Sequence, residues 1–329
     1  MHMRYACLIL CAGFADSFTA VHAQEYPHRA IRFVVPFTAG GGVDIAARVL
    51  GQKITENWGY PVVIDNRTGS NCIIGQEAVA RATPDGHTIL IQSIGFVVNP
   101  NLYKLPYDTN KDFIPVTQIV GTPLMLVVNP AVPAKTVKEL IALAKSRPNQ
   151  LNYASFGTGS IAHLAGEMLK TMTGIEMVHI AYKGASPALT DVLSGQIQVM
   201  LPSISTVLSH ISTGKLRGLA VTMRQRTPHA PEMPTMIEAG VPGYEAVSWV
   251  SVFLPSRTPR PIVTKLHDEV VRIVKLPEVK SQFDTQGFDL ARYDLVPNAP
   301  ESPEEFSRFI KAEMGKYAKI IKQAGLKIE

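Results

Sequence analysis

Residues 31–48 read Ile-Arg-Phe-Val-Val-Pro-Phe-Thr-Ala-Gly-Gly-Gly-Val-Asp-Ile-Ala-Ala-Arg. Residues 31–35 predict a buried strand, which Pro36 ends because proline donates no ladder hydrogen bond. The glycine triplet 40–42 lets a ligand approach the backbone closely, and the apolar spacing around Asp44 predicts a helix. The free amides and positive dipole end of that helix favour a carboxylate or phosphate in the turn. A tight strand-to-helix turn without a ligand is the alternative.

The composition is that of an ordinary globular protein. The chain has 329 residues, of which 46% are hydrophobic and 18% charged, so it can bury substantial cores and form two domains. The formal net charge is +5 and the pI is near 9.0, with basic residues scattered along the chain. This pattern gives a nucleic-acid surface little support and suits an anionic small ligand at least as well.

The first 23 residues differ from the rest. Arg4 gives a short positive start, residues 5–14 form an apolar run, and residues 21–23 offer small side chains before a cut. We predict a secretory signal peptide, residues 1–23, that is cleaved before Gln24, and a periplasmic location for the mature protein. No other segment approaches the roughly 18 uninterrupted apolar residues of a membrane span.

Cysteine usage is compatible with export. Cys7 and Cys11 leave with the predicted signal peptide, so the mature chain keeps only Cys72, which cannot form an intramolecular disulfide. Nothing near Cys72 in the sequence suggests a histidine base. We interpret it as a partly buried residue at a helix start.

Strand and helix patterns alternate through the first two thirds of the chain. Predicted strands cover residues 62–64, 88–92, 124–128, 153–155, 177–180, 199–201 and 216–221. Predicted helices cover residues 74–82, 136–146, 160–172 and 187–193, the second capped by Thr136 with Glu139 at the capping-box position. This alternation predicts parallel sheets with helices on both faces.

The C-terminal third has a strand at 249–254 and helices at 261–275, 277–286 and 303–324. With so little strand, these helices are expected to pack on the N-terminal sheet. The middle block is then an inserted domain, joined by crossing segments near residues 118–124 and 244–253. We assign residues 24–120 and 250–329 to lobe 1 and residues 121–249 to lobe 2. A double connection of this kind makes a hinged cleft that suits closure around a small molecule.

Residues 153–167 repeat the strand, glycine loop and helix start in lobe 2. Ser160 can cap the new helix and, with the amides of residues 158–162, can hold an oxyanion. Residues 157–162 also match the dinucleotide pattern Gly-x-Gly-x-x-Ala. The acidic residue that would bind a ribose is missing, because residues 181–183 at the end of the next strand read Ala-Tyr-Lys. We therefore predict no nicotinamide cofactor.

Metal and catalytic sites find little support in the sequence. His163 and Glu167 lie one helical turn apart, but a third metal ligand cannot be placed. The loop 182–188 is either a plain turn or a place where Lys183 helps to steer anions. Gly-x-Ser-x-Gly, a Walker loop and His-Glu-x-x-His are absent from the sequence. No catalytic residue, metal or cofactor is predicted.

An ordered set of segments resembles the substrate-binding proteins of tripartite tricarboxylate transporters, the Bug or TctC family. The segments are residues 34–37 through Asp44 and Arg48, 63–67, 84–88, 153–167, and 182–184 with 187–188. The resemblance implies a type 2 periplasmic-binding-protein fold, a Venus flytrap of two α/β lobes joined by a double-crossover hinge. It also implies a carboxylate pinched between the loops 37–44 and 156–163, largely by backbone amides and bridging waters.

The sequence departs from the family after Arg67. The family usually has Gly-Ala-Gly-Gly before the next helix, whereas residues 69–75 here read Gly-Ser-Asn-Cys-Ile-Ile-Gly. If this helix start borders the cleft, Asn71 and Cys72 make the pocket smaller and more polar than usual. The identity of the ligand therefore does not transfer from the family.

Together these features predict a monomeric periplasmic solute-binding protein that captures an organic carboxylate and delivers it to a tripartite tricarboxylate-type membrane transporter. The expected ligand-binding residues lie on the two loops and at strand ends. They are Phe37, Thr38, Ala39, Gly40, Gly41, Gly42, Asp44, Ser93, Phe156, Thr158, Gly159, Ser160, His163, Lys183 and Ser203. Two alternatives remain open: a receptor that docks on a membrane sensor, and an enzyme with His163 as base and Lys183 as electrostatic partner.

Overall fold

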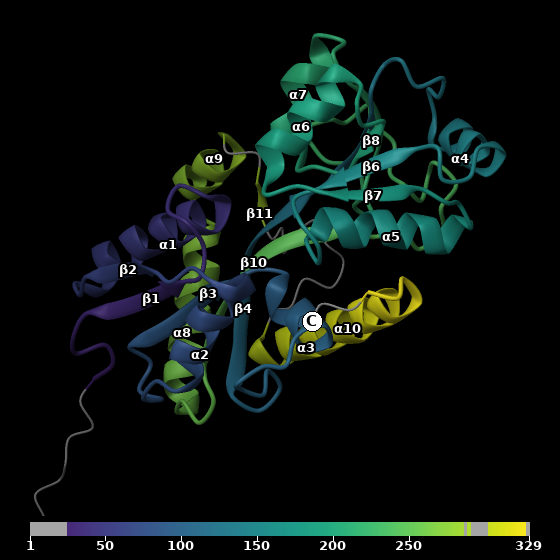
Figure 1. Ribbon diagram of the computed structural model, residues 1–329. Coiled ribbons are helices and arrows are strands. Elements are labelled where there is room, and N and C mark those ends of the chain that lie inside the picture. Colours follow the sequence, from purple (N-terminus) through teal and green to yellow (C-terminus); the bar gives the residue numbers. More distant parts are fainter. Residues whose placement is uncertain (1–24, 286–287, 291–301, 327–329) are drawn as a thin grey trace, which may run out of the picture.

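The computed structural model describes residues 25–285, 288–290 and 302–326. The predicted signal peptide lies outside these residues. The described chain forms two α/β lobes, each built on its own sheet, and has the flytrap fold that the sequence analysis predicted (Figure 1). None of the described helices is both long enough and apolar enough to cross a membrane.

The first lobe is built on a six-stranded sheet with the order β11-β4-β10-β3-β1-β2. The strands are β1 (Ile31–Val35), β2 (Val62–Asn66), β3 (Thr88–Gln92), β4 (Phe113–Pro123), β10 (Val247–Pro255) and β11 (Asp289–Leu290). β1 is parallel to β2 and β3, as predicted. The prediction of parallel strands is wrong for β10, which runs antiparallel to β3 and β4 because the chain re-enters this sheet directly from the other lobe.

The second lobe is built on a five-stranded sheet with the order β7-β6-β8-β5-β9. The strands are β5 (Met125–Val128), β6 (Asn152–Ser155), β7 (Val178–Ala181), β8 (Val199–Met200) and β9 (Arg217–Val221). β6 is parallel to β7 and β8, whereas β5 is antiparallel to β8 and β9. Each sheet therefore has a parallel part, as expected, and an antiparallel part next to the hinge.

Ten helices and a short 3-10 turn are present among the described residues. They are α1 (Gly42–Trp58), η1 (Ser70–Cys72), α2 (Ile73–Ala80), α3 (Gly95–Leu102), α4 (Val137–Ser146), α5 (Ile161–Thr173), α6 (Ala185–Ser194), α7 (Ile204–Ser212), α8 (Arg260–Val274), α9 (Pro277–Thr285) and α10 (Pro303–Gln323). The predicted caps of α4 and α5 are confirmed, since Thr136 and Ser160 each accept a hydrogen bond from a first-turn amide. The sequence analysis missed α3, which contains Pro100, and α7, which is rich in Ser, Thr and β-branched residues.

Two segments connect the lobes side by side. β4 ends at Pro123 in one sheet and β5 begins at Met125 in the other, while β10 begins immediately after Ala246. Thr222, which is fully buried, joins these segments. Its Oγ1 accepts a hydrogen bond from the Leu124 N–H (3.0 Å) and donates to the Ala246 carbonyl (2.6 Å). The hinge is thus a double connection with a side-chain cross-link.

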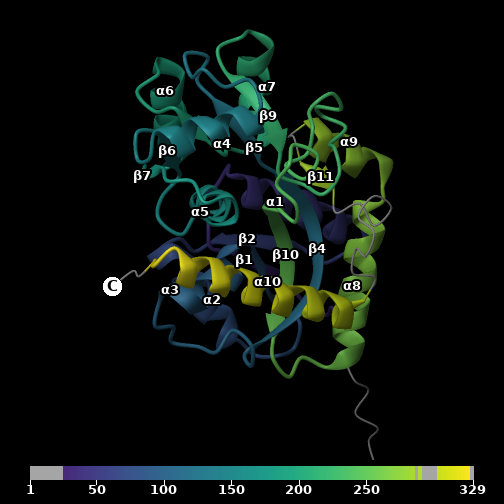
Figure 2. The ribbon, with the colours of Figure 1, turned by 90° about the vertical axis from the view of Figure 1, so that its right-hand side faces the viewer.

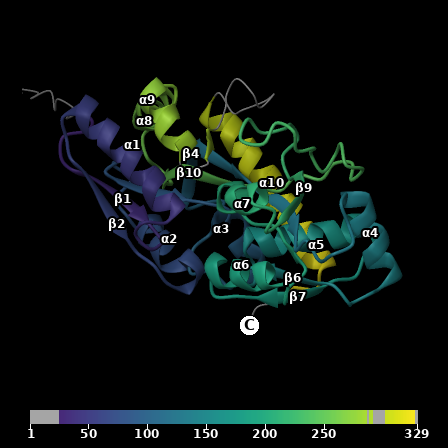
Figure 3. The same cartoon turned by 90° about the horizontal axis from the view of Figure 1, so that it is seen from above.

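Helix α10 lies along both lobes. It packs against β4 and α3 of the first lobe and against α5 of the second, as Figures 1 and 2 show from two sides. Phe306 contacts Phe253, and Phe309 meets Trp249 edge-to-face (6.3 Å between ring centroids). One apolar core consequently runs from the first-lobe sheet through α10 to α5. Seen from above, the lobes stand at opposite ends of the molecule, with β4 and β10 passing between them (Figure 3).

Candidate functional site

The first loop, residues 37–44, connects β1 to α1. Gly40 has a φ of 81°, a left-handed conformation that favours glycine. Gly41 is the N-cap of α1, and no side chain caps this helix. Thr38, Ala39 and Gly40 are exposed. The first-turn amides of α1 therefore lack a side-chain acceptor and are left for solvent or an anion.

The Asp44 carboxylate supports the first loop through hydrogen bonds. Its carboxylate is buried and accepts hydrogen bonds from the Gly40 N–H (2.8 Å), Arg48 Nε (2.8 Å) and Asn66 Nδ2 (2.9 Å). Asn66 Nδ2 also donates to the Phe37 carbonyl (3.0 Å). Burial raises the pKa of Asp44, but these hydrogen bonds outweigh burial and leave the pKa below its ordinary value. Both carboxylate oxygens are thus engaged within the chain, so Asp44 shapes the loop.

The second loop, residues 156–163, connects β6 to α5. Several of its backbone amides donate hydrogen bonds to acceptors in or next to the loop. Ser160 Oγ accepts from the His163 N–H (3.4 Å), and the Gly157 carbonyl accepts from the Ser160 N–H (3.1 Å). The Gly157 N–H donates to Ser155 Oγ (3.2 Å). Gly157 and Gly159 both have positive φ values, of 134° and 79°. This loop is fixed internally to a greater degree than the first.

His163 lies behind the second loop and is only 1% exposed. Its Nδ1 accepts a hydrogen bond from the Gly159 N–H (3.0 Å), so the neutral ring carries its proton on Nε2. The ring stacks on His179 of β7, with 3.7 Å between centroids and 8° between planes. Burial, then the neighbouring His179 and Lys170, lower the pKa of His163 to about 3. Burial also lowers the pKa of His179, so both rings are neutral at pH 7.

The other predicted residues follow strands of the parallel part of each sheet. Ser93 comes after β3, which neighbours β1, and its side chain is buried. Lys183 comes after β7 and is exposed, whereas Ser203 is the half-buried N-cap of α7. The Tyr182 N–H donates to the Ser155 carbonyl (3.1 Å), which places the Lys183 loop beside the second loop. The structure thus gathers these residues at the carboxyl ends of the strands, within each lobe.

The segment that departs from the family pattern is an unusual turn. Ser70, Asn71 and Cys72 have φ values of 43°, 51° and 74°, a left-handed run without glycine. Asn99 holds the turn, since its Nδ2 donates to the Asn71 carbonyl (2.7 Å) and its Oδ1 accepts from Asn71 Nδ2 (2.9 Å). Cys72 is the N-cap of α2, and burial raises its pKa to about 11. The prediction of a partly buried helix-start cysteine is confirmed, and such a thiol is a poor nucleophile at pH 7.

The roles of four supporting residues escaped the sequence analysis. Ser155 and His179 support the second loop, but they lie on different strands and meet only because β6 and β7 pair in register. Phe288 lies against the start of α1, where a Cβ on Gly42 would come within 3.1 Å of its ring. Asn66 belonged to a matching segment, yet its bond to Asp44 depends on the pairing of β1 with β2. Only the spatial arrangement reveals these roles.

The structure argues against Glu167 as a second metal ligand beside His163. Both oxygens of Glu167 are engaged: Oε1 accepts from Tyr153 Oη (2.6 Å) and from Lys170 Nζ (2.9 Å), and Oε2 accepts from Lys170 Nζ (3.1 Å). Within residues 25–285, 288–290 and 302–326, three or more His, Cys, Asp or Glu side chains do not gather at one point in a way that could hold a metal ion.

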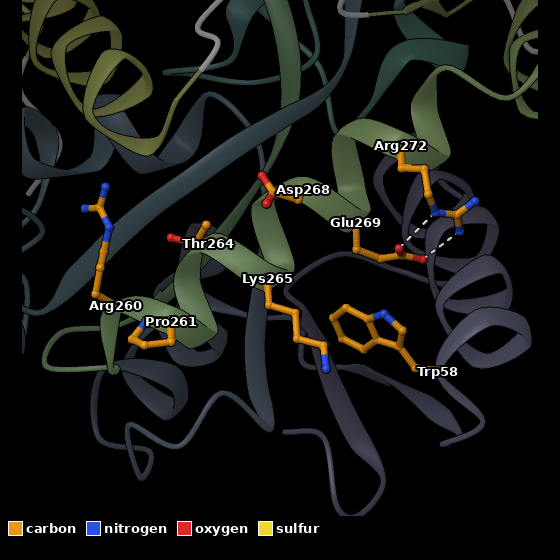
Figure 4. A pocket seen from close by; sticks show the side chains of 8 residues that line it. All are labelled: Trp58, Arg260, Pro261, Thr264, Lys265, Asp268, Glu269 and Arg272. Carbon is orange, nitrogen blue, oxygen red and sulfur yellow. Dashed lines mark hydrogen bonds and ion pairs between the residues drawn. The ribbon is translucent and has the colours of Figure 1, made fainter. Parts of the chain in front are cut away.

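A hollow of the first lobe lies along α8, beside Trp58 at the C-terminal end of α1 (Figure 4). Its volume is about 760 Å³, and it is lined by Trp58, Arg260, Pro261, Thr264, Lys265, Asp268, Glu269 and Arg272. Its charged groups already have partners in the chain. Glu269 accepts from Arg272 and Asn57, and Lys265 Nζ donates to the Tyr26 carbonyl (2.7 Å). We assign no ligand to this hollow.

Comparisons with known proteins agree with the two-lobed fold. A family model described as "Tripartite tricarboxylate transporter family receptor" (TctC) matches residues 46–326. Protein BugT of Bordetella pertussis is 33% identical over 98% of this chain and 96% of its own. The structure of R. palustris Rpa4515 with adipate has 34% identity and a TM-score of 0.78, covering 92% of this chain and 100% of that one. MatC from Rhodopseudomonas palustris with bound malate has 28% identity and a TM-score of 0.74, covering 90% and 100%.

Proposed function

The chain belongs to the tripartite tricarboxylate transporter receptor family, and from that premise we propose that it captures a small organic dicarboxylate between its two loops. The protein then acts as a periplasmic binding protein that hands its ligand to a membrane transporter of the tripartite type. The first loop and the second loop hold one carboxylate as the lobes close. Ser93, Lys183 and Ser203 contact the rest of the ligand.

One observation carries the proposal: a strand, a glycine loop and a helix start follow one another once in each lobe. β1 and β6 each lie within a parallel part of their sheet, and each is followed by a glycine loop and a helix start. Open α/β sheets place ligands at this edge, and helix starts favour anions there. The only carboxylate within the first loop, Asp44, is paired with Arg48, so it does not repel an anionic ligand.

The ligand class rests on the neighbours. Rpa4515 was solved with adipate and MatC with malate, both of which carry two carboxylates. In this chain the exposed Lys183 beside the second loop offers a cation for a second carboxylate. If the left-handed turn at residues 70–72 borders the ligand, Asn71 and Cys72 make the pocket smaller and more polar than is usual in the family.

The chemistry of His163 favours binding over catalysis. A general base works best when its pKa lies near the operating pH. The pKa of His163 is about 3, chiefly because of burial, and its Nδ1 already accepts the Gly159 N–H. The ring is therefore a poor general base at neutral pH, and its hydrogen bond with Gly159 supports the second loop instead.

Calorimetry with adipate and malate tests the proposal, with the uncharged diamide of adipate as the ligand control. Gly40→Ala and Gly59→Ala form a matched pair of variants. Both glycines have left-handed φ values, of 81° and 74°, and a Cβ at either position meets open space. Each change should cost about 1 kcal/mol of stability, because alanine disfavours this conformation.

The two variants should differ in binding. Gly40→Ala places a methyl group and backbone strain within the first loop, so affinity for the bound dicarboxylate should fall at least about tenfold. Gly59→Ala lies at the far end of α1 and should bind like the wild type. Equal losses in both variants, or no heat from any dicarboxylate in the wild type, would contradict the proposed function.

A further inference from the structure

The second loop rests on a pair of histidine rings. His163 of α5 and His179 of β7 stack almost in parallel, 3.7 Å apart between centroids. Tyr153 of β6 extends the stack, with its ring 5.0 Å from His179 and 6.4 Å from His163. Three elements of the second lobe therefore contribute one aromatic column behind the loop.

Each imidazole is connected to a different glycine of the loop. His163 Nδ1 accepts the Gly159 N–H directly (3.0 Å). His179 Nε2 lies 2.6 Å from Ser155 Oγ, and Ser155 Oγ in turn is within hydrogen-bond distance of the Gly157 N–H (3.2 Å) and carbonyl (3.1 Å). The two residues with left-handed backbone are thus held by two neutral rings through specific atoms.

We propose that His179 and Ser155 are positioning residues for carboxylate capture, and that they hold the second loop in its binding shape only while both stacked imidazoles are neutral. The inference rests on the proposed function and deepens it. Neither residue need touch the ligand: Ser155 acts through Gly157, and His179 acts through Ser155 and through its stack on His163.

The hydrogen bonds show why a proton would disturb this arrangement. A proton on His163 Nδ1 would point at the Gly159 N–H, a donor against a donor. A proton added to either ring would place its charge 3.7 Å from a second titratable ring, and two charged rings would repel each other directly.

The charged groups nearby do not compensate. Glu167 of α5 is the acidic group that favours a charged His179, but Lys170 and the Tyr153 hydroxyl already bind its oxygens. Lys170 of the same helix disfavours a proton on either ring. Tyr153 of β6 adds no charge, since burial raises its pKa far above the ordinary value.

The proposal has a directional consequence for ligand binding. The pKa of His179 lies below its ordinary value of 6.5, mainly because of burial. Affinity for a carboxylate should therefore fall as the pH drops through that pKa, because a charge on the buried ring is unfavourable against His163 and destabilises the stack behind the loop. If His179 instead served as a cationic partner of the ligand, acid would strengthen binding.

The test uses calorimetric titration with adipate, and with malate where adipate gives no heat, at a series of pH values from 7.5 down to the lowest at which the protein stays folded. His179→Gln keeps a polar side chain for Ser155 but cannot titrate. His210→Gln, on α7 of the same lobe, is the matched control. Ionisation of the ligand affects all proteins equally, so differences between the pH profiles isolate His179.

We expect wild type and His210→Gln to weaken together in acid, with up to about tenfold loss in affinity per pH unit below the pKa of His179 beyond that of the ligand. His179→Gln should bind more weakly than the wild type at pH 7.5, because the stack on His163 is lost, and should lack this extra loss in acid. Ser155→Ala should weaken binding about fivefold at pH 7.5, the effect of one lost hydrogen bond. Identical profiles in wild type and His179→Gln, or unchanged affinity in Ser155→Ala, would overturn the inference.

Amide hydrogen exchange of residues 157–160 without ligand separates this inference from the proposed function. Exchange in the wild type should accelerate, relative to the intrinsic rate, as the pH falls from 7.5 through the pKa of His179, and His179→Gln should suppress that change. A wild type that binds neither carboxylate but shows this exchange pattern would refute the function and keep the role of the histidines. Equal exchange in both proteins would refute that role even if adipate binds.

Discussion

The first loop and the second loop occupy the same place in their lobes, between a strand and a helix start, and have opposite internal chemistry. The first is held by an ionic group, since the buried Asp44 carboxylate receives Arg48, Asn66 and the Gly40 amide. The second is held by neutral groups, since two stacked imidazoles and Ser155 bind its glycines. The first leaves the start of α1 without a side-chain cap, whereas Ser160 caps α5.

Two loops at matching positions of the two lobes can therefore divide the work of binding. The uncapped, exposed first loop has backbone donors to offer, and its support keeps its charge down to low pH. The second loop is partly buried, has fewer free donors and rests on histidine rings whose pKa values burial lowers. We expect the first loop to supply most of the contacts with the anion, and the second loop to set the pH range in which the anion is bound.

The largest effect is expected from removal of the ionic support. Asp44→Ala leaves Arg48, Asn66 and the Gly40 amide without their acceptor and should lower the free energy of unfolding by about 3 kcal/mol. Adipate binding should be lost. Urea denaturation and calorimetry measure both. Asp65→Asn, at a more exposed carboxylate paired with Arg67, is the control and should change stability by less than about 1 kcal/mol.

Acid should distinguish the two supports by stability alone. Between pH 6.5, the ordinary histidine pKa, and about pH 3, residue His163 is protonated in the unfolded chain and neutral in the folded one. The free energy of unfolding therefore falls as the pH drops through this range. The loss should reach about 2 kcal/mol between pH 6.5 and 5.0 and should be smaller in His163→Gln. The stabilisation from Asp44 is lost only below its ordinary pKa of 3.8, since its folded pKa is lower still. Urea titrations at pH 7.5, 6.5 and 5.0 give the comparison, and equal slopes in both proteins would contradict it.

The smallest effects should come from exchanging the caps. Ser160→Ala removes the acceptor of the His163 N–H and should lower the free energy of unfolding by about 1 kcal/mol. Gly41→Ser adds a cap to α1 at an extended position, with φ of −77°, and should raise stability by roughly a few tenths of a kcal/mol. The new hydroxyl would occupy an amide of the first loop and weaken adipate binding. A Gly41→Ser protein that binds adipate more tightly would show that this amide does not serve the ligand.

Local sequence signals located most of the elements that carry the candidate site. Proline, glycine and capping residues placed the ends of β1 and the starts of α1, α4 and α5, because these features act within one turn of the chain. The signals failed where tertiary contacts override propensity. Pro100 lies inside α3, and Asn71 and Cys72 adopt left-handed backbone that Asn99 holds.

The glycine loops that precede helices in two α/β units, and the family to which the ordered motifs belong, both follow from residue types at fixed spacing. What supports each loop follows only from tertiary contacts. The pairing of β1 with β2 brings Asn66 to Asp44, and the pairing of β6 with β7 brings His179 to Ser155. Strand register and ring stacking depend on contacts between residues far apart in the chain. Such contacts have no signature in local spacing, because many registers satisfy the same alternation of polar and apolar side chains.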